Sequence, residues 1–233
     1  MSTSGSMSEL QWQKLLERLK EKYRLKQVCL EIETRPIELM KVENIDDLLD
    51  QVNDPDEIPF WAELWPASIG LATAILRNPS LWRGKTVLEL GSGVGLAGIA
   101  ATMAGAEVTQ SDFLEDAFDF IRVNRWRNGI DQTSLLLADW RHFPERAGTF
   151  DRVIGADILY EKTLHDPLAA VLHRVIRRDG FVWLADPGRV YGRDFVQKQT
   201  DADWKVRQSQ INVDYQEKPY VIDLYQMTPP GTI

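Results

Sequence analysis

A cluster of glycines follows a short apolar segment in the first half of the chain. The stretch Val87–Gly95 reads Val-Leu-Glu-Leu-Gly-Ser-Gly-Val-Gly, and a helical pattern comes after it. Glycine permits positive φ angles and lets a ligand approach the backbone, while a helix N-terminus offers free N–H groups. Gly91, Gly93 and Gly95 therefore predict a loop that binds a nucleotide-like ligand.

Acidic residues follow at places that suit the rest of such a ligand. Asp112 ends the next predicted strand, about 20 residues after the glycines, where an acid commonly binds ribose hydroxyls. Asp139 and Trp140 follow the third strand, and an acid beside an aromatic ring suits the edge and face of a purine. Glu89, inside the first strand, would repel a pyrophosphate but favours a cationic ligand. The set favours a positively charged ligand.

Three further runs surround the same expected site. Asp157-Ile-Leu-Tyr160 ends the fourth strand, and Asp186-Pro-Gly-Arg189 ends the fifth. Phe60-Trp-Ala-Glu-Leu-Trp-Pro66 precedes the first strand. Trp65 lies directly before a proline and an apolar helix, which places it to cover a ligand.

Structural interpretations of these runs remain open beside the functional ones. Asp157 suits a helix N-cap, since Asp is favoured there. Trp61 and Tyr160 suit an apolar core, and Arg189 suits an exposed helix face.

The elements that would position these residues alternate along the chain. Strands separated by helices indicate a parallel sheet with crossover helices, and the carboxyl ends of its strands meet at one edge. Two later runs, 204–213 and 220–227, leave no room for a helix between them and predict a closing antiparallel hairpin. The predicted strands are 86–90, 107–110, 134–138, 151–156 and 181–185, and the predicted helices are about 94–104, 114–128, 163–177 and 190–199.

The N-terminal part differs from this rhythm. Residues 1–7 suggest a disordered leader or a remnant of cloning ahead of a native Met7. Residues 8–57 are expected to form an appendage to a main domain over 58–233. Within the appendage, the patterns predict a helix over 9–23, strands over 27–32 and 36–42, and a short helix over 44–52.

Composition excludes several classes of protein. The 233 residues carry a formal net charge of −8, which argues against a nucleic-acid binder. One cysteine, Cys29, and three scattered histidines allow no disulfide and no metal site of the usual spacing. No apolar run is long enough to span a membrane, so we expect a cytoplasmic protein without membrane contact.

The glycine run, Asp112, Asp139-Trp140 and the terminal hairpin together resemble class I S-adenosylmethionine-dependent methyltransferases over residues 60–228. The resemblance implies a Rossmann-like α/β fold: a seven-strand sheet with helices on both faces and the seventh strand antiparallel. It implies S-adenosylmethionine as cofactor and S-adenosylhomocysteine as product, with the glycine loop on the methionine part, Asp112 on the ribose and Asp139 with Trp140 on the adenine. The implied cofactor-binding residues are Trp65, Glu89, Gly91, Gly93, Gly95, Asp112, Phe113, Asp139, Trp140 and Ala156.

A narrower resemblance comes from the other three runs. Phe60–Pro66, the Asp-x-x-Tyr motif at Asp157–Tyr160 and the run Asp186–Arg189 resemble protein-lysine methyltransferases, and are most similar to those acting on the electron-transfer flavoprotein β subunit. This resemblance implies a protein substrate that presents a lysine. It also implies catalytic roles for Asp157 and Tyr160, with Asp157 positioning the amine.

Three alternatives to a protein-lysine methyltransferase stay open. A small-molecule N- or O-methyltransferase on the same scaffold separates poorly from it on sequence. An intact glycine loop with Asp112, Asp157 and Tyr160 counts against a catalytically silent binding module. Glu89 and the terminal hairpin count against a dinucleotide oxidoreductase. The sequence does not fix the oligomeric state.

Overall fold

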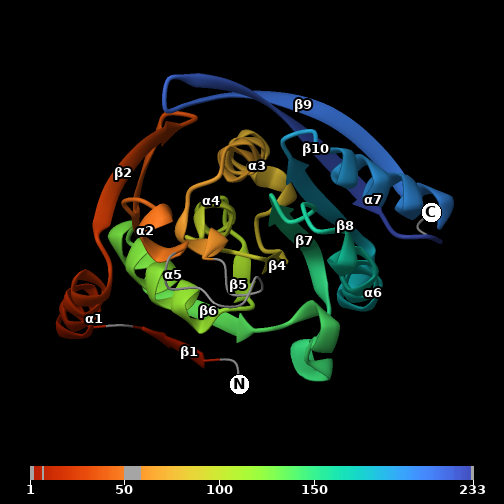
Figure 1. Cartoon of the computed structure of the whole chain (residues 1–233). Coiled ribbons are helices and arrows are strands. Elements are labelled where there is room, and N and C mark those ends of the chain that lie inside the picture. Colours follow the sequence, from red (N-terminus) through yellow and green to blue (C-terminus); the bar gives the residue numbers. More distant parts are fainter. Residues whose placement is uncertain (1–2, 7, 50–58, 232–233) are drawn as a thin grey trace.

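The computed structural model describes residues 3–6, 8–49 and 59–231. The described chain forms an eight-stranded sheet in the order β1-β6-β5-β4-β7-β8-β10-β9 (Figure 1). Strands β4 to β8 pair in parallel, whereas β10 pairs antiparallel with both β8 and β9. The strands are β1 (Thr3–Ser6), β4 (Thr86–Leu90), β5 (Glu107–Asp112), β6 (Gln132–Leu137), β7 (Phe150–Ala156), β8 (Ile176–Asp186), β9 (Lys205–Tyr215) and β10 (Lys218–Thr228).

Helices cover both faces of this sheet because its parallel strands are apolar on both sides. Along β4, Val87 packs with α3 and α4 on one face, while Leu88 and Leu90 pack with α6 and α7 on the other. The predicted α/β sheet with helices on both faces is confirmed. The helices are α3 (Pro66–Arg77), α4 (Leu96–Met103), α5 (Glu115–Arg127), α6 (His165–Val175) and α7 (Val190–Asp201), with short 3-10 turns η2 (Phe60–Ala62), η3 (Pro79–Leu81), η4 (Trp140–His142), η5 (Glu145–Ala147) and η6 (Lys162–Leu164).

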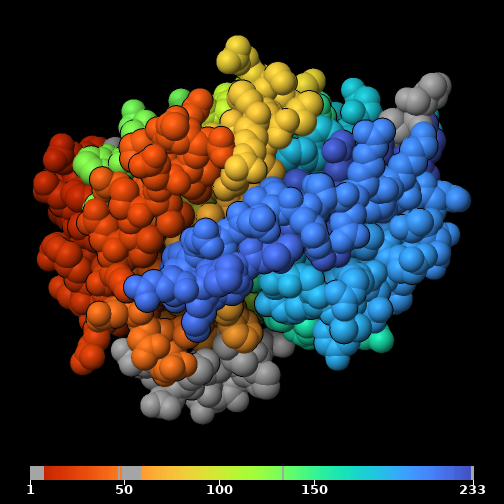
Figure 2. All heavy atoms as spheres, turned by 90° about the horizontal axis from the view of Figure 1, so that it is seen from above, coloured from red at the N-terminus to blue at the C-terminus, as the bar shows by residue number. Residues whose placement is uncertain are grey.

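The closing hairpin is confirmed, and its second strand is the one inserted into the sheet. β10 lies between β8 and β9, so β9 forms the edge. The turn at Gln216-Glu217 has both residues at positive φ, 50° and 59°, the backbone of the tight turns that suit a twisted hairpin. Figure 2 shows this C-terminal hairpin, in blue, reaching across to the N-terminal residues in orange and red.

The other edge of the sheet corrects one expectation. Residues 1–7 were expected to be a disordered leader or a remnant of cloning; Thr3–Ser6 form β1, which pairs antiparallel with β6, and the second alternative stays a prediction. Small polar residues carry no strand pattern, so the sequence gives no sign of this pairing. An open sheet edge nevertheless accepts any extended backbone through its unpaired N–H and C=O groups.

The N-terminal appendage has the predicted elements. Helix α1 (Glu9–Lys22) begins with a capping box at Ser8, and β2 (Leu25–Ile32) pairs with β3 (Arg35–Val42) in a separate two-stranded sheet. The short helix expected over 44–52 is α2 (Asp46–Leu49) as far as residue 49, and its remainder lies outside the described residues. The domain boundary near residue 57 stays a prediction for the same reason.

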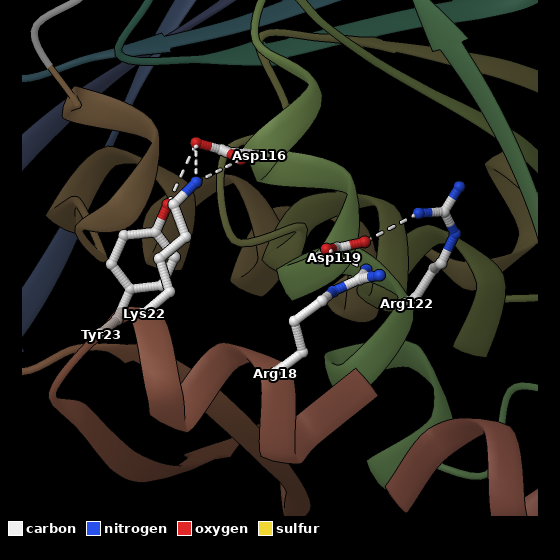
Figure 3. A network of polar contacts seen from close by, with 6 residues as sticks. All are labelled: Arg18, Lys22, Tyr23, Asp116, Asp119 and Arg122. Atoms are coloured by element: carbon white, nitrogen blue, oxygen red, sulfur yellow. Dashed lines mark hydrogen bonds and ion pairs between the residues drawn. The ribbon is translucent and has the colours of Figure 1, made fainter. Parts of the chain in front are cut away.

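The appendage is fastened to α5 by two kinds of contact. At the surface, Arg18 and Arg122 both bond to Asp119, and Lys22 and Tyr23 both bond to Asp116, at 2.6–3.0 Å (Figure 3). Exposed ion pairs of this kind contribute little each. In the interior, the fully buried side chain of Asn124 accepts from the Met40 amide at 2.6 Å and donates to the Met40 carbonyl at 3.0 Å.

The Asn124 contacts bind β3 to the same helix that flanks the glycine loop, because Asn124 also donates to the carbonyl of Val94 at 2.8 Å.

None of the described helices is both long and apolar enough to cross a membrane.

Candidate active site

A cavity of about 190 Å³ opens at the carboxyl ends of β4, β5 and β7. The strand order reverses here, since the chain continues from β4 to β5 on one side and β7 lies on the other. Ligands of open α/β sheets bind at such a switch point. All but one of the predicted site residues line the cavity, namely Trp65, Glu89, Gly91, Gly93, Asp112, Phe113, Asp139, Trp140, Ala156, Asp157 and Tyr160.

Gly95 is the exception, and its place explains why it is a glycine. It precedes α4 with a φ of 86°, and a Cβ there would lie 2.9 Å from the Gln110 amide nitrogen. Gly93 is also at positive φ, and its Cβ would lie 3.1 Å from the Trp61 carbonyl oxygen. Gly95 therefore allows the loop to pack closely on Gln110 at the start of α4, while Gly93 lets the Trp61 backbone approach the loop.

Asp112 holds the glycine loop from the end of β5. Its carboxylate accepts from the amide of Gly93 at 2.9 Å and from that of Leu114 at 3.2 Å. Burial raises the pKa of the Asp112 carboxyl, and these amide donors act in the opposite direction. The carboxylate thus stands between the loop and the start of α5, facing the cavity.

Glu89 lies in a buried polar network beneath α4 as well as on the cavity wall. The Gln110 side-chain amide donates to its carboxylate at 2.7 Å, and Arg125 donates to the side-chain oxygen Oε1 of Gln110 at 3.0 Å. Burial raises the pKa of Glu89 to about 7, against the hydrogen bond from Gln110. A Cβ on Gly98 would come within 2.5 Å of the Glu89 carboxylate, so this helix position must be glycine to accommodate the network.

Asp139, Arg141 and Phe113 form one connected part of the cavity lining. Asp139 accepts from the Arg141 amide at 2.9 Å and from its guanidinium at 3.0 Å. Burial on its own would raise the pKa of Asp139, but the bonds from Arg141 outweigh it and lower the pKa. The same guanidinium lies 5.6 Å from the centre of the Phe113 ring, a cation–π contact.

Three aromatic rings in contact form another part of the cavity wall. Phe60 stands edge-on to Tyr160 and to Trp65, with ring centres 5.6 and 6.1 Å apart. The Trp65 indole nitrogen donates to the Phe60 carbonyl at 2.9 Å, which fixes the ring. Trp61 also lines the cavity, and its ring packs against Tyr23 and Phe120 in the core that the appendage shares with α5.

Asp157 has an unusual backbone and a charged partner. Its φ is +60°, a region that non-glycine residues seldom adopt and that often marks functional sites. Its carboxylate accepts a hydrogen bond from the Arg189 guanidinium. Burial raises the pKa of Asp157, and Arg189 opposes this shift. Arg189 is therefore not simply an exposed helix residue.

The sequence did not single out every residue of the wall. Within the described residues, the lining is rich in acids: Glu63 and Glu161 join the four predicted carboxylates, with Arg141 as the basic counterpart. Glu63 lies in the run Phe60–Pro66 already noted, but nothing in the sequence indicates that it faces the cavity. In the described part of the chain, no cluster of three His, Cys, Asp or Glu side chains could hold a metal ion.

Glu63 also links the cavity to the appendage. The Lys41 ammonium, only 2% exposed, donates to the Glu63 carboxylate at 2.7 Å and to the Val42 carbonyl at 2.9 Å. Because Lys41 lies on β3, the appendage supports one wall of the cavity from outside.

Comparisons with known proteins agree with this geometry. Residues 51–198 match the lysine methyltransferase family model. The electron transfer flavoprotein beta subunit lysine methyltransferase of Rattus norvegicus is 36% identical over 137 residues, 58% of this chain and 53% of that protein. Protein N-lysine methyltransferase METTL21A of Xenopus tropicalis is 34% identical over 117 residues, 48% of this chain and 54% of that protein.

Among solved structures, a precorrin-6y C5,15-methyltransferase from Geobacter metallireducens GS-15 superposes with a TM-score of 0.56 at 16% identity, covering 67% of this chain and 86% of that one. At this identity the likeness shows the fold alone. The chain spans about half the length of the relatives it matches. Because the family model covers well over half of the residues, the chain belongs to the lysine methyltransferase family.

Proposed function

We propose that this protein is an S-adenosylmethionine-dependent methyltransferase whose acceptor is a lysine side chain of a protein. The observation that carries the proposal is the acidic, partly aromatic cavity at the switch point of a methyltransferase sheet. Acidic and aromatic groups attract cations, and both the donor sulfonium and an approaching lysine are cationic. Family membership and the two lysine methyltransferase relatives support the same reaction.

The cavity has parts that suit each portion of the cofactor. The loop at Gly91 and Gly93 gives backbone access for the methionine part, and the buried Asp112 carboxylate suits the ribose hydroxyls. Asp139, Trp140 and Phe113, which line the cavity, would hold the adenine. Glu89, Trp65 and Ala156 complete the wall, and Gly95 shapes the loop from beneath.

When bound, S-adenosylmethionine supplies a methyl group on a positively charged sulfur, so the leaving group departs neutral. The protein has to align the acceptor nitrogen with that methyl group and to exclude water. Asp157 and Tyr160 line the same cavity as the glycine loop, and a hydrogen bond from the amine to Asp157 would fix the direction of the amine. Trp65 and Tyr160 would contact the cationic amine through their ring faces.

The acceptor must lose a proton before it reacts. A free lysine has a pKa near 10.4, so roughly one molecule in two thousand is neutral at pH 7. The positive sulfonium lowers the pKa of a nearby amine, and Asp157 raises it. The proposed role of Asp157 is therefore positioning, with the proton released to water.

Exposed apolar side chains favour a protein over a small acceptor. Eight large apolar side chains are exposed within the described residues, and six of these lie at or after the carboxyl ends of strands or belong to η2. A protein substrate would cover such side chains on docking, whereas a small acceptor would leave them in water. The six are Phe60, Phe113, Leu137, Tyr160, Val190 and Tyr191.

Two features bear on the surroundings of the protein. The net charge of −8 disfavours nucleic acid as the substrate. Cys29 is a free, exposed thiol, which suits a reducing compartment such as the cytoplasm.

Incubation with radiolabelled S-adenosylmethionine and a cell extract tests the proposal. We expect label in a protein band with wild type, and loss of that label with Asp157→Asn. The control is Asp166→Asn, whose side chain in the first turn of α6 is 90% exposed and does not line the cavity. Label confined to small molecules would show a metabolite methyltransferase instead, and absence of any label would contradict methyl transfer.

A further inference from the structure

The turn after β8 brings an arginine back to the carboxylate at the end of β7. β8 ends at Asp186, Gly188 adopts a φ of 82°, and Arg189 caps the start of α7. The Arg189 amide donates to the Asp186 carboxylate at 2.6 Å, which fixes the turn. The reversal at Gly188 places the Arg189 guanidinium on the carboxylate of Asp157.

The Arg189 guanidinium forms ion pairs with two buried carboxylates, those of Asp157 and Asp186. The same nitrogen, Nη1 of Arg189, contacts Oδ1 of Asp157 and lies 3.4 Å from Oδ2 of Asp186. Asp157 is 8% exposed and Asp186 is fully buried. Two carboxylates in such surroundings would repel each other without a cation. Arg189 therefore fixes both the orientation and the net charge of this group.

One carboxylate oxygen of Asp157, Oδ2, can accept a hydrogen bond from a further donor. Arg189 occupies its Oδ1, and within the described residues no hydrogen bond reaches its Oδ2. Asp157 also lines the cavity, so an amine that enters can donate to this carboxylate. The guanidinium meanwhile weakens the negative field at that amine, and a weaker field makes the amine easier to deprotonate.

We infer that Arg189 is a positioning residue, which orients Asp157 toward the acceptor amine and offsets the charge that would otherwise keep the amine protonated. The inference rests on the proposed lysine methyl transfer. If Arg189 only braced the turn at 186–189, its removal would leave the pH dependence of transfer unchanged.

Two substitutions and a matched control separate these roles. Arg189→Met removes the charge and keeps much of the bulk, while Arg189→Lys keeps the charge without the planar fork. Arg193→Met makes the same change one turn further along α7, where Arg193 bonds to the Gly188 carbonyl at 2.5 Å. No hydrogen bond or ion pair joins Arg193 to Asp157 within the described residues.

We expect Arg189→Met to lower kcat by about tenfold to a hundredfold, since misorientation of a reacting group has effects of this size. The rise of kcat with pH should move upward by about one pH unit, because Asp157 then acts on the amine without its counter-charge. Cofactor affinity by calorimetry should stay within about twofold. Arg189→Lys should recover part of the loss, and Arg193→Met should behave as wild type.

An NMR titration of the Asp157 carboxyl tests the Arg189–Asp157 contact independently of enzyme activity. Arg189→Met should raise the pKa of Asp157, because the opposing cation is gone. An unchanged titration together with an unchanged pH–rate profile would overturn the inference, and so would an equal effect of Arg193→Met. If wild type transfers no methyl group to lysine, the proposed function fails, while the titration still decides whether Arg189 controls Asp157.

Discussion

Glu89, Asp112 and Asp157 each lie at or near the end of a different strand, and each meets different hydrogen-bond donors. Backbone amides hold Asp112, a glutamine amide holds Glu89, and a guanidinium holds Asp157. A carboxylate held by amides can accept hydroxyl donors from a ligand, whereas one paired with an arginine carries less net charge. At the residue scale, these environments suggest different tasks for chemically similar side chains.

Asp112→Ala should weaken binding of S-adenosylmethionine. The substitution removes the acceptor proposed for the ribose hydroxyls and the bond to the Gly93 amide, so we expect a loss of about 1–3 kcal/mol, or roughly ten- to a hundredfold in Kd. Calorimetric titration measures it. Asp119→Ala, on the outer side of α5, is the control and should bind as wild type; an unaltered affinity of Asp112→Ala would refute the ribose assignment.

Glu89 should make stability depend on pH. Its pKa is about 7 in the folded state against 4.5 for the free side chain, so the folded state binds more protons between these values. Stability is then greatest below pH 4.5 and falls as the pH rises toward 7, by on the order of 3 kcal/mol from this group.

Urea unfolding of wild type and Glu89→Gln at a series of pH values checks this. The variant cannot ionise, so the difference in unfolding free energy between the two proteins should shift in favour of Glu89→Gln as the pH rises. A difference that does not vary with pH would show that Glu89 is already ionised when the protein is folded.

At the element scale, the regular strands and helices could be predicted and the connections could not. The strand 86–90 was predicted with its final bounds, because a short apolar run before glycines has few alternatives. β8 begins at Ile176 rather than near 181, since the three charged residues that follow the buried Ile176 are exposed and interrupt any apolar pattern. The turn Gln216-Glu217 lacks the Asn-Gly signal, so its positive φ values follow from the pairing of β9 with β10.

In the site, too, some features could be predicted from the sequence and others could not. The acids and glycines at the strand ends were predictable, because parallel strands bring their carboxyl ends together. The Arg189–Asp157 contact was not, because it depends on the reversal at Gly188. Trp61 and Trp65 come from one short run and both line the cavity, yet only Trp61 also belongs to the buried core that the appendage shares with α5.

The attachment of the appendage gives a prediction at this scale. Asn124→Ala should destabilise the fold by about 2–4 kcal/mol, because it leaves the Met40 amide and carbonyl buried without partners. Arg18→Ala, which removes an exposed ion pair to Asp119, should cost less than about 1 kcal/mol. Chemical denaturation measures both. Similar costs for the two variants would mean that surface charges, and not the buried amide, fasten the appendage.

At the scale of the whole molecule, the excess of acids is concentrated where a cation would bind. The cavity wall carries six carboxylates and one guanidinium within the described residues, and the chain as a whole has a net charge of −8. The appendage supports this wall through Lys41 and Glu63, and the C-terminal hairpin lies beside the appendage (Figure 2). The sheet thus carries one acidic site that suits a cation, and the appendage contacts its wall through the Lys41–Glu63 ion pair.

Mass spectrometry of the methylated product tests the central claim most directly. The protein that becomes labelled in a cell extract is isolated after reaction with wild type and with Asp157→Asn, and its peptides are sequenced. The account predicts mass increments of whole methyl groups on a lysine side chain with wild type, and none with the variant. Methylation on another residue type, or equal methylation by Asp157→Asn, would contradict it.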